Sequence, residues 1–109
     1  MNGLELIAAE RQRHVEKEGW TPEHDAEHSE GELAEAAACY AMTERARDLP
    51  VEGETDLETG ATTGVSTQLW PWDATWWKPT PENRIRELVK AGALIAAEID
   101  RLQRSSSQK

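Results

Sequence analysis

Apolar residues recur at helical spacing in three stretches of this 109-residue chain, separated by a long middle segment without such a pattern. The first stretch predicts a helix over about residues 3–18. We expect it to end near Gly19, because glycine readily adopts the left-handed conformation found past helix ends. The apolar residues that share one face of this helix are Leu4, Ile7, Ala8 and Val15.

A second helix is predicted over about residues 30–47. Ser29 and Glu32 have the spacing of a capping box and stand directly before an alanine-rich run. Because alanine side chains are small, a partner helix can approach this helix closely, but each contact buries little apolar surface.

The third helix has the clearest start signal. Thr80 can cap it, and Pro81 suits the first helical position, where a missing N–H costs nothing. Apolar residues then recur at steps of three and four, which predicts the best core-facing stripe of the chain. They are Ile85, Leu88, Val89, Gly92, Ile95, Ala96, Ile99 and Leu102.

The middle segment, residues 49–79, is rich in Gly, Thr and Pro, and residues 48–58 carry five acids and no base. Such a composition buries too little apolar surface to offset its ordering entropy, which favours a variable acidic arm or a short hairpin over residues 48–68. Residues 65–70 are the only strand candidate, and residues 105–109 predict a disordered tail.

These elements predict one domain over residues 1–109. Its expected fold class is mainly α: a three-helix arrangement with a long irregular arm or short β-hairpin between the second and third helices. A domain this short buries a smaller fraction of its surface than a larger one. We therefore expect a homo-oligomer.

The charge and the cysteine content limit the classes of binding partner and the cellular compartment that we expect for this protein. The chain has 21 acidic and 12 basic residues, a net charge of −9, which argues against duplex nucleic acid or an anionic membrane as a partner. Its single cysteine, Cys39, cannot form an internal disulfide, and the longest apolar runs are far shorter than the roughly 20 residues that span a bilayer. With no secretory signal in the N-terminal residues, we expect a cytoplasmic protein.

Four of the five tryptophans lie in the segment LWPWDATWWKP, directly before cationic residues. Indole faces stack on nucleobases, and guanidinium groups together with helix N-terminal amides bind phosphate. This pairing predicts a site for a small anionic nucleotide-like ligand, although the indoles equally suit the core of a chain without phenylalanine. The predicted ligand-binding residues are Trp20, Trp72, Trp76, Trp77, Lys78, Arg84, Arg86 and Lys90.

Glu32 and Glu35 place two carboxylates on one helix face, as a Mg²⁺ site requires, although a solvated acidic face explains them better. The pair resembles the all-α nucleoside triphosphate pyrophosphohydrolases of the MazG type, where an acidic pair and a later E-x-x-D hold the metal. The matching stretch here runs from Glu87 to Lys90, so a lysine that repels Mg²⁺ stands at the aspartate position. The metal ligands of such an enzyme would be Glu32 and Glu35, together with Glu87 or Glu98.

His24 and His28 are four residues apart, so a short helix capped by Thr21 would place both on one face, with Asp25 adjacent. Zn²⁺ or Mn²⁺ can use this spacing, but a complete site needs a further carboxylate or a second subunit. We favour the alternative, in which these histidines cap a helix and hydrogen-bond to neighbouring acids.

Four strings resemble, in their order, a widespread family of small phage and prophage proteins: AERQRHVEKEGWTPEHD, GELAEAAACYA, WPWDATWWKP and RELVKAGALIAAEIDRL. The resemblance covers residues 4–46 and 69–102. The chain is similar, more faintly, to phage proteins that sequester defence signalling nucleotides, in a tryptophan near position 20, a later aromatic cluster and an arginine-bearing helix. This likeness implies an anti-defence sponge in the host cytoplasm, without a cofactor or catalytic residues.

We therefore expect a non-enzymatic protein that captures a small anionic nucleotide-like ligand. One alternative is a Mg²⁺-dependent nucleoside triphosphate pyrophosphohydrolase. A second alternative is an inhibitor that binds a host protein through the indole cluster, since tryptophan is common at interaction hot spots.

Overall fold

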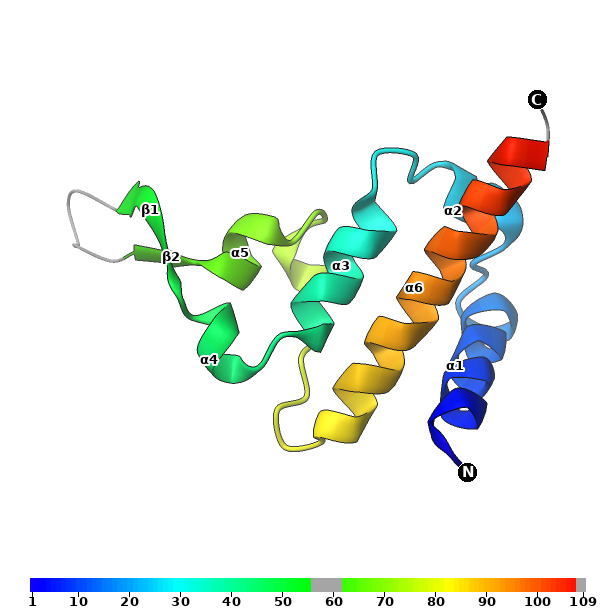
Figure 1. Cartoon of the computed structure of the whole chain (residues 1–109), viewed down its shortest axis with the longest axis horizontal. Helices are drawn as coiled ribbons and strands as arrows, with labels where there is room; N and C mark the ends of the chain where they lie inside the picture. The colour runs from blue at the N-terminus through cyan, green and yellow to red at the C-terminus, as the bar shows by residue number, and fades with distance from the viewer. Residues whose placement is uncertain (56–61, 108–109) are drawn as a thin grey trace.

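The computed structural model describes residues 1–55 and 62–107 and is mainly helical, as the sequence predicts (Figure 1). Three helices form one layer, with α6 (Arg84–Ser107) between α1 (Gly3–Lys17) and α3 (Glu32–Ala41). The short elements are α2 (Pro22–Ala26), α4 (Glu44–Arg47), β1 (Pro50–Thr55), β2 (Thr62–Gly64), α5 (Val65–Leu69) and the 3-10 turn η1 (Ala74–Trp76). Within the described ranges, no helix is both long and apolar enough to cross a bilayer.

The first predicted helix is confirmed, but its buried face is not the predicted one. Asn2 and Glu5 cap the helix reciprocally, and Gly19 beyond its end takes the left-handed conformation, with φ of 71°. The buried residues of α1 are Glu10 and His14. The predicted apolar face instead leaves Leu4, Ala8 and Val15 exposed and Ile7 half-buried.

The predicted second helix is interrupted and forms two helices. Met42 leaves the helical conformation with ψ of 145°, and Thr43 caps the separate helix α4 by accepting a hydrogen bond from the Ala46 N–H. The expected capping box at Ser29 is wrong. Gly31 is the N-cap residue of α3, with φ of 88°, a conformation that favours glycine over a residue with a side chain.

The core lies between α3 and α6, which run antiparallel (Figure 1). Small side chains dominate it, so the two helices approach closely, as the alanine-rich sequence predicts. The cluster consists of Leu33, Ala36, Ala37, Tyr40, Ala91, Leu94 and Ala97. Four tryptophans cover one side of this cluster: Trp20, Trp70, Trp72 and Trp77.

Helix α6 begins three residues later than predicted. Asn83, rather than Thr80, provides the cap, because its Oδ1 accepts a hydrogen bond from the Arg86 N–H. The preceding residues form a turn in which the Asn83 N–H donates to the Thr80 carbonyl.

The predicted core stripe of α6 is largely exposed. Only Val89 among its residues is buried, whereas the core-facing residues of α6 are mostly alanines and paired carboxylates. The large apolar residues of the stripe point to solvent: Ile85, Leu88, Ile95, Ile99 and Leu102. Hydrophobic spacing alone therefore predicts the exposed face of α6 as the buried one. The face that is actually buried consists mostly of alanines and of carboxylates in ion pairs.

The middle segment forms the short hairpin that the sequence allows, with β1 and β2 antiparallel. Residues 65–70 are not a strand, since α5 occupies most of them. Residues 56–61 of the predicted arm lie outside the described residues. At the C-terminus, α6 continues through Ser107 where the sequence predicts a disordered tail, and residues 108–109 are not described.

Candidate functional site

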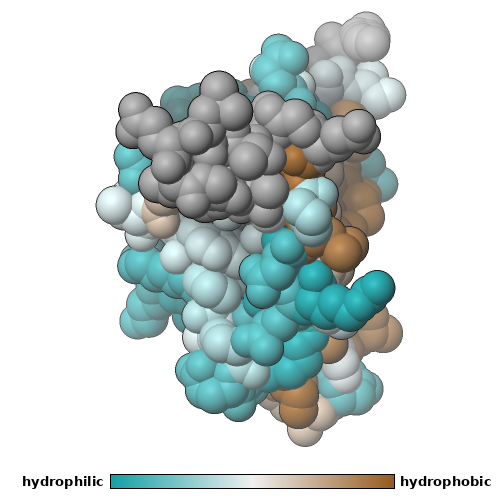
Figure 2. Space-filling view, turned by 90° about the vertical axis from the view of Figure 1, so that its left-hand side faces the viewer, coloured by the Kyte–Doolittle hydropathy of each residue, from teal (hydrophilic) through white to brown (hydrophobic). Residues whose placement is uncertain are grey.

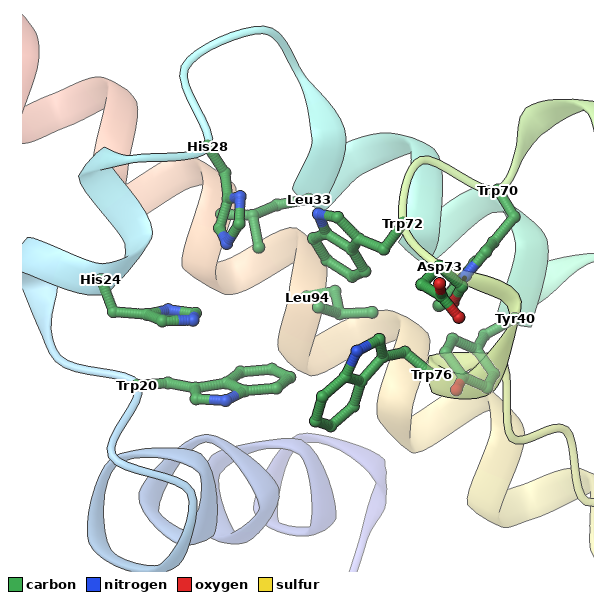
Figure 3. Close-up of a pocket in the computed structure, with 10 residues that line it drawn as sticks. All are labelled: Trp20, His24, His28, Leu33, Tyr40, Trp70, Trp72, Asp73, Trp76 and Leu94. Carbon is green, nitrogen blue, oxygen red and sulfur yellow. Dashed lines mark hydrogen bonds between the residues drawn. The ribbon is translucent and has the colours of Figure 1, made fainter.

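A cavity of about 420 Å³ lies where the indole cluster meets the segment that follows α1 (Figure 3). Three parts of the chain line it: the loop and helix after α1, the paired faces of α3 and α6, and the segment around η1. The lining residues are Trp20, His24, His28, Leu33, Tyr40, Trp70, Trp72, Asp73, Trp76 and Leu94.

Local hydrogen bonds fix the N-terminal wall of the cavity. The turn at Gly19 lets the Trp20 N–H donate to the His14 carbonyl over 2.9 Å. Thr21 then caps α2 by accepting from the His24 N–H, as the sequence predicts, and Pro22 fills the first helical position. These contacts point both rings of the wall, Trp20 and His24, into the cavity (Figure 3).

The rings of this wall form a continuous chain of contacts around the cavity. Trp20 and His24 are stacked, with centroids 5.4 Å apart and planes inclined by 9°. His24 meets His28 edge to face at 5.0 Å, and His28 meets Trp72 at 5.1 Å. Trp72 in turn contacts Trp70 at 5.4 Å. Such aromatic pairs are each worth about 1 kcal/mol beyond their buried area, so the wall is preorganised.

The segment around η1 closes the opposite wall. The Trp70 Nε1 donates to the Asp73 carbonyl, and the Asp73 carboxylate accepts from the Thr75 N–H over 2.8 Å, which lowers the pKa of Asp73. Trp76 is 63% exposed and stands at the mouth. Trp77 lies outside the lining and packs on Tyr40 instead.

Three residues that line the cavity carry polar ring atoms: His24, His28 and Trp72. The His24 Nδ1 lies 3.1 Å from an oxygen of the buried Asp25 carboxylate, and the His28 Nδ1 lies 3.5 Å from Glu32 Oε2. In the neutral imidazole, these contacts place the proton on Nδ1 and leave Nε2 as an acceptor. The Trp72 Nε1 is buried and has no hydrogen-bond partner among the described residues.

Two predicted cationic residues lie beside the cavity. Lys90 Nζ sits 5.2 Å from the centroid of the Tyr40 ring and donates to the Lys78 carbonyl, and burial lowers the pKa of Lys90. Lys78 itself lies over Trp76, at 5.8 Å from the ring centroid. Among the described lining residues, Asp73 is the only one of opposite charge to these lysines.

The two predicted arginines are held by protein groups. Arg84 donates to the carbonyls of Tyr40 and Met42 at the C-terminal end of α3, and to Glu87. Arg86 makes a bidentate ion pair with Glu10, at 2.7 and 3.0 Å. Although burial raises the pKa of Glu10, hydrogen bonds from Arg13 and Arg86 lower it to about 2.

The carboxylates considered for Mg²⁺ do not gather into one site. Glu87 is buried between Arg47 and Arg84, and these hydrogen bonds lower its pKa against the effect of burial. Glu98 pairs with Arg101. Glu32 and Glu35 lie in the first turn of α3, whose other end packs on the start of α6 where Glu87 lies. Across the described parts of the chain, no group of three His, Cys, Asp or Glu residues has metal-binding geometry, the set His24, Asp25 and His28 included.

Sequence reasoning misses several of the lining residues. It considers His24 and His28 only as metal ligands or caps, and Tyr40 only as part of an apolar run. Trp70 belongs to the indole cluster but ends the segment expected to be a strand. The available signal is the aromatic content of residues 20–28, since His24 and His28 follow Trp20 at four-residue steps, which repeat on one side of a helix.

Comparison with known proteins identifies no relative of this chain. No family model, no curated protein and no solved structure matches the chain.

Proposed function

We propose that this protein binds a small nucleotide-like ligand, with the flat ring of the ligand inside the aromatic cavity. The observation that carries the proposal is the continuous chain of rings from Trp20 through His24, His28 and Trp72 to Trp70. A nucleobase stacked on one indole face gains about 1–3 kcal/mol. The cavity volume of about 420 Å³ lies within the usual range for small-ligand sites.

The polar atoms of the wall match the edge of a base. The Nε2 atoms of His24 and His28 accept hydrogen bonds from an exocyclic amino group, and the unpartnered Trp72 Nε1–H donates to a ring nitrogen or carbonyl. A buried donor without a partner costs free energy. A ligand acceptor at this position would remove that cost, which supports a polar planar ligand over a purely apolar one.

The anionic part of the ligand would lie along α6. Leu94 lines the cavity, and Lys90 precedes it by one helical turn on the same face. Lys90 lies over the ring of Tyr40, and Lys78 lies over the ring of Trp76. We assign to these lysines the role expected for Arg84 and Arg86, because Arg84 binds the carbonyls at the end of α3 and Arg86 pairs with Glu10.

Calorimetric titration with adenosine, AMP, ATP and cyclic ADP-ribose tests the proposal, with each compound followed by chromatography before and after heat denaturation. We expect at least one phosphorylated compound to bind and to return intact. Trp76→Ala removes an exposed wall of the cavity and should weaken binding at least fivefold, whereas Trp77→Phe changes an indole outside the lining and should leave affinity within twofold.

The variant Lys90→Gln tests the contact with the phosphate group separately from the contact with the base. It should weaken the binding of AMP and leave the binding of adenosine unchanged, since adenosine carries no charge. Failure of all four compounds to bind would contradict the proposal. Conversion of ATP to AMP and pyrophosphate only in the presence of Mg²⁺ would replace it with the pyrophosphohydrolase alternative.

A further inference from the structure

Most of the large apolar side chains of α6 lie on a face that the single chain leaves open. Five of them are between 48% and 67% exposed: Ile85, Leu88, Ile95, Ile99 and Leu102. Consecutive helical residues are rotated by about 100°, so Ile95 and Ile99 point away from the cavity that Leu94 lines. Figure 2 shows hydrophobic residues gathered along one edge of the molecule, beside a largely hydrophilic surface.

This stripe has the spacing of a helix-pairing seam. Its positions, 85, 88, 92, 95, 99 and 102, follow one another at alternating steps of three and four, the heptad pattern by which two helices interlock. Position 92 is a glycine, and Ile7 of α1 fills the space that a side chain would take, because a Cβ there would overlap the Ile7 Cδ1. Ile7 of α1 therefore supplies the apolar side chain at the one position of the stripe where α6 has none.

Helix α1, whose Ile7 contacts α6 at Gly92, also leaves apolar side chains exposed. Leu4 is 80% exposed and Val15 is 43% exposed, and both belong to the α1 face that hydrophobic spacing marks for burial. The same is true of the α6 stripe. Two neighbouring helices thus leave uncovered the faces that their sequences mark as buried, which indicates a partner outside the single chain.

We propose that a second copy of this chain covers the seam, forming a two-fold dimer through α6. Identical seams are self-complementary under two-fold symmetry, since each knob meets the hole of the same seam on the other copy. None of the six seam positions carries a charge, although the chain as a whole has a net charge of −9. Two copies therefore meet with least repulsion along this stripe.

The size of the face suits a reversible dimer. The seam from residue 85 to residue 102 is about 26 Å long, and with α1 beside it the face is about 20 Å wide. This area approaches the roughly 600 Å² per partner at the lower limit of specific interfaces. A lipid surface is a poorer occupant, because amphipathic helices that lie on membranes carry basic residues and this chain is acidic.

Sedimentation equilibrium from about 1 to 300 µM tests the proposal. We expect wild-type mass to rise from 12.2 kDa towards twice that value, and Ile95→Lys to remain monomeric with unchanged helical circular dichroism. The matched control is Leu49→Lys, which changes a side chain of similar exposure, 44%, outside the seam and should still dimerise.

Leu88→Lys is a second test, at the other half of the seam. If Ile95→Lys loses helicity, the mass of the Leu88→Lys variant decides whether the seam forms the dimer. A wild-type protein that stays monomeric at all concentrations would overturn the proposal. So would dimers that persist in a folded seam variant, since the pairing surface would then lie elsewhere. Neither variant touches the cavity, so ligand binding by a monomeric variant would leave the proposed function standing.

Discussion

Arg47, in the last turn of α4, and Glu87, in the first turn of α6, form a buried ion pair 40 residues apart in sequence, with Arg47 Nη1 donating to Glu87 Oε2 over 2.8 Å. Arg47 also donates to the carbonyls of Cys39 and Tyr40. One guanidinium therefore joins the end of α3, the short helix α4 and the start of α6.

Replacing Arg47 should be among the most destabilising single changes in the chain. Arg47→Met removes one of the two arginines that pair with the buried Glu87 carboxylate, which keeps only Arg84 and the Thr80 N–H as donors, and it removes the side-chain donor to the Cys39 carbonyl. We expect the free energy of unfolding to fall by about 3 kcal/mol. Urea denaturation measures the loss. Arg45→Met, an exposed neighbour on the same short helix, should change stability by less than about 0.5 kcal/mol. Similar losses in the two variants would contradict this role of Arg47.

The pH dependence of stability should contain a clear contribution from Glu10. Its pKa is lowered to about 2 in the folded protein, against 4.5 ordinarily, so its ion pairs stabilise the fold fully above about pH 5. This stabilisation, up to about 3 kcal/mol, is lost as the pH falls from about 4.5 to 2. The difference in unfolding free energy between wild type and Glu10→Gln should shrink over that range. A difference independent of pH would show that Glu10 contributes through packing alone.

Gly64 is required where the hairpin passes α4. A Cβ at this position would lie 2.6 Å from the Arg47 carbonyl oxygen, a backbone atom that cannot rotate away. We expect Gly64→Ala to lower the melting temperature, with a loss of about 1–3 kcal/mol. Gly3→Ala is the matched control, since a Cβ there meets nothing within 4 Å, and it should leave stability unchanged or raise it slightly. A neutral Gly64→Ala variant would mean that the hairpin moves freely against α4.

Cys39 should be unreactive in the native protein. Its thiol is fully buried, and burial raises its pKa to about 11, so little thiolate is present at neutral pH. We expect reaction with a disulfide reagent at pH 8 to be at least a hundredfold slower than in 6 M urea. The rate measured in native buffer reports how often the α3 region opens. Immediate labelling in native buffer would contradict the burial of this residue.

The helices could be predicted from the sequence, but the faces they bury could not. Apolar spacing locates α1 and α6, and glycine at position 19 marks the end of α1. The burial of Glu10 and Glu87 could not be foreseen, because each depends on arginines distant in sequence. These pairs turn polar faces inward and leave most of the larger apolar residues of α6 exposed.

The cavity could be predicted only in part, for a similar reason. The indole cluster is recognisable as a binding surface, and Trp20 as a wall. The contribution of His24 and His28 depends on how α2 folds back towards the segment around η1, which no local pattern encodes. The predicted phosphate contacts of Arg84 and Arg86 require free guanidinium groups, whereas the fold uses both to satisfy carbonyls or a carboxylate.

Most rings of the cavity come from positions 20–28 and 70–76, two segments far apart in the sequence, so the complete wall exists only when the chain is folded. Any compound that occupies it must then favour the native state over the unfolded state, by about 2.7 kcal/mol at a concentration one hundred times its dissociation constant. A rise in melting temperature therefore identifies ligands of any chemical class. The arrangement of this wall therefore links ligand binding to the stability of the native state.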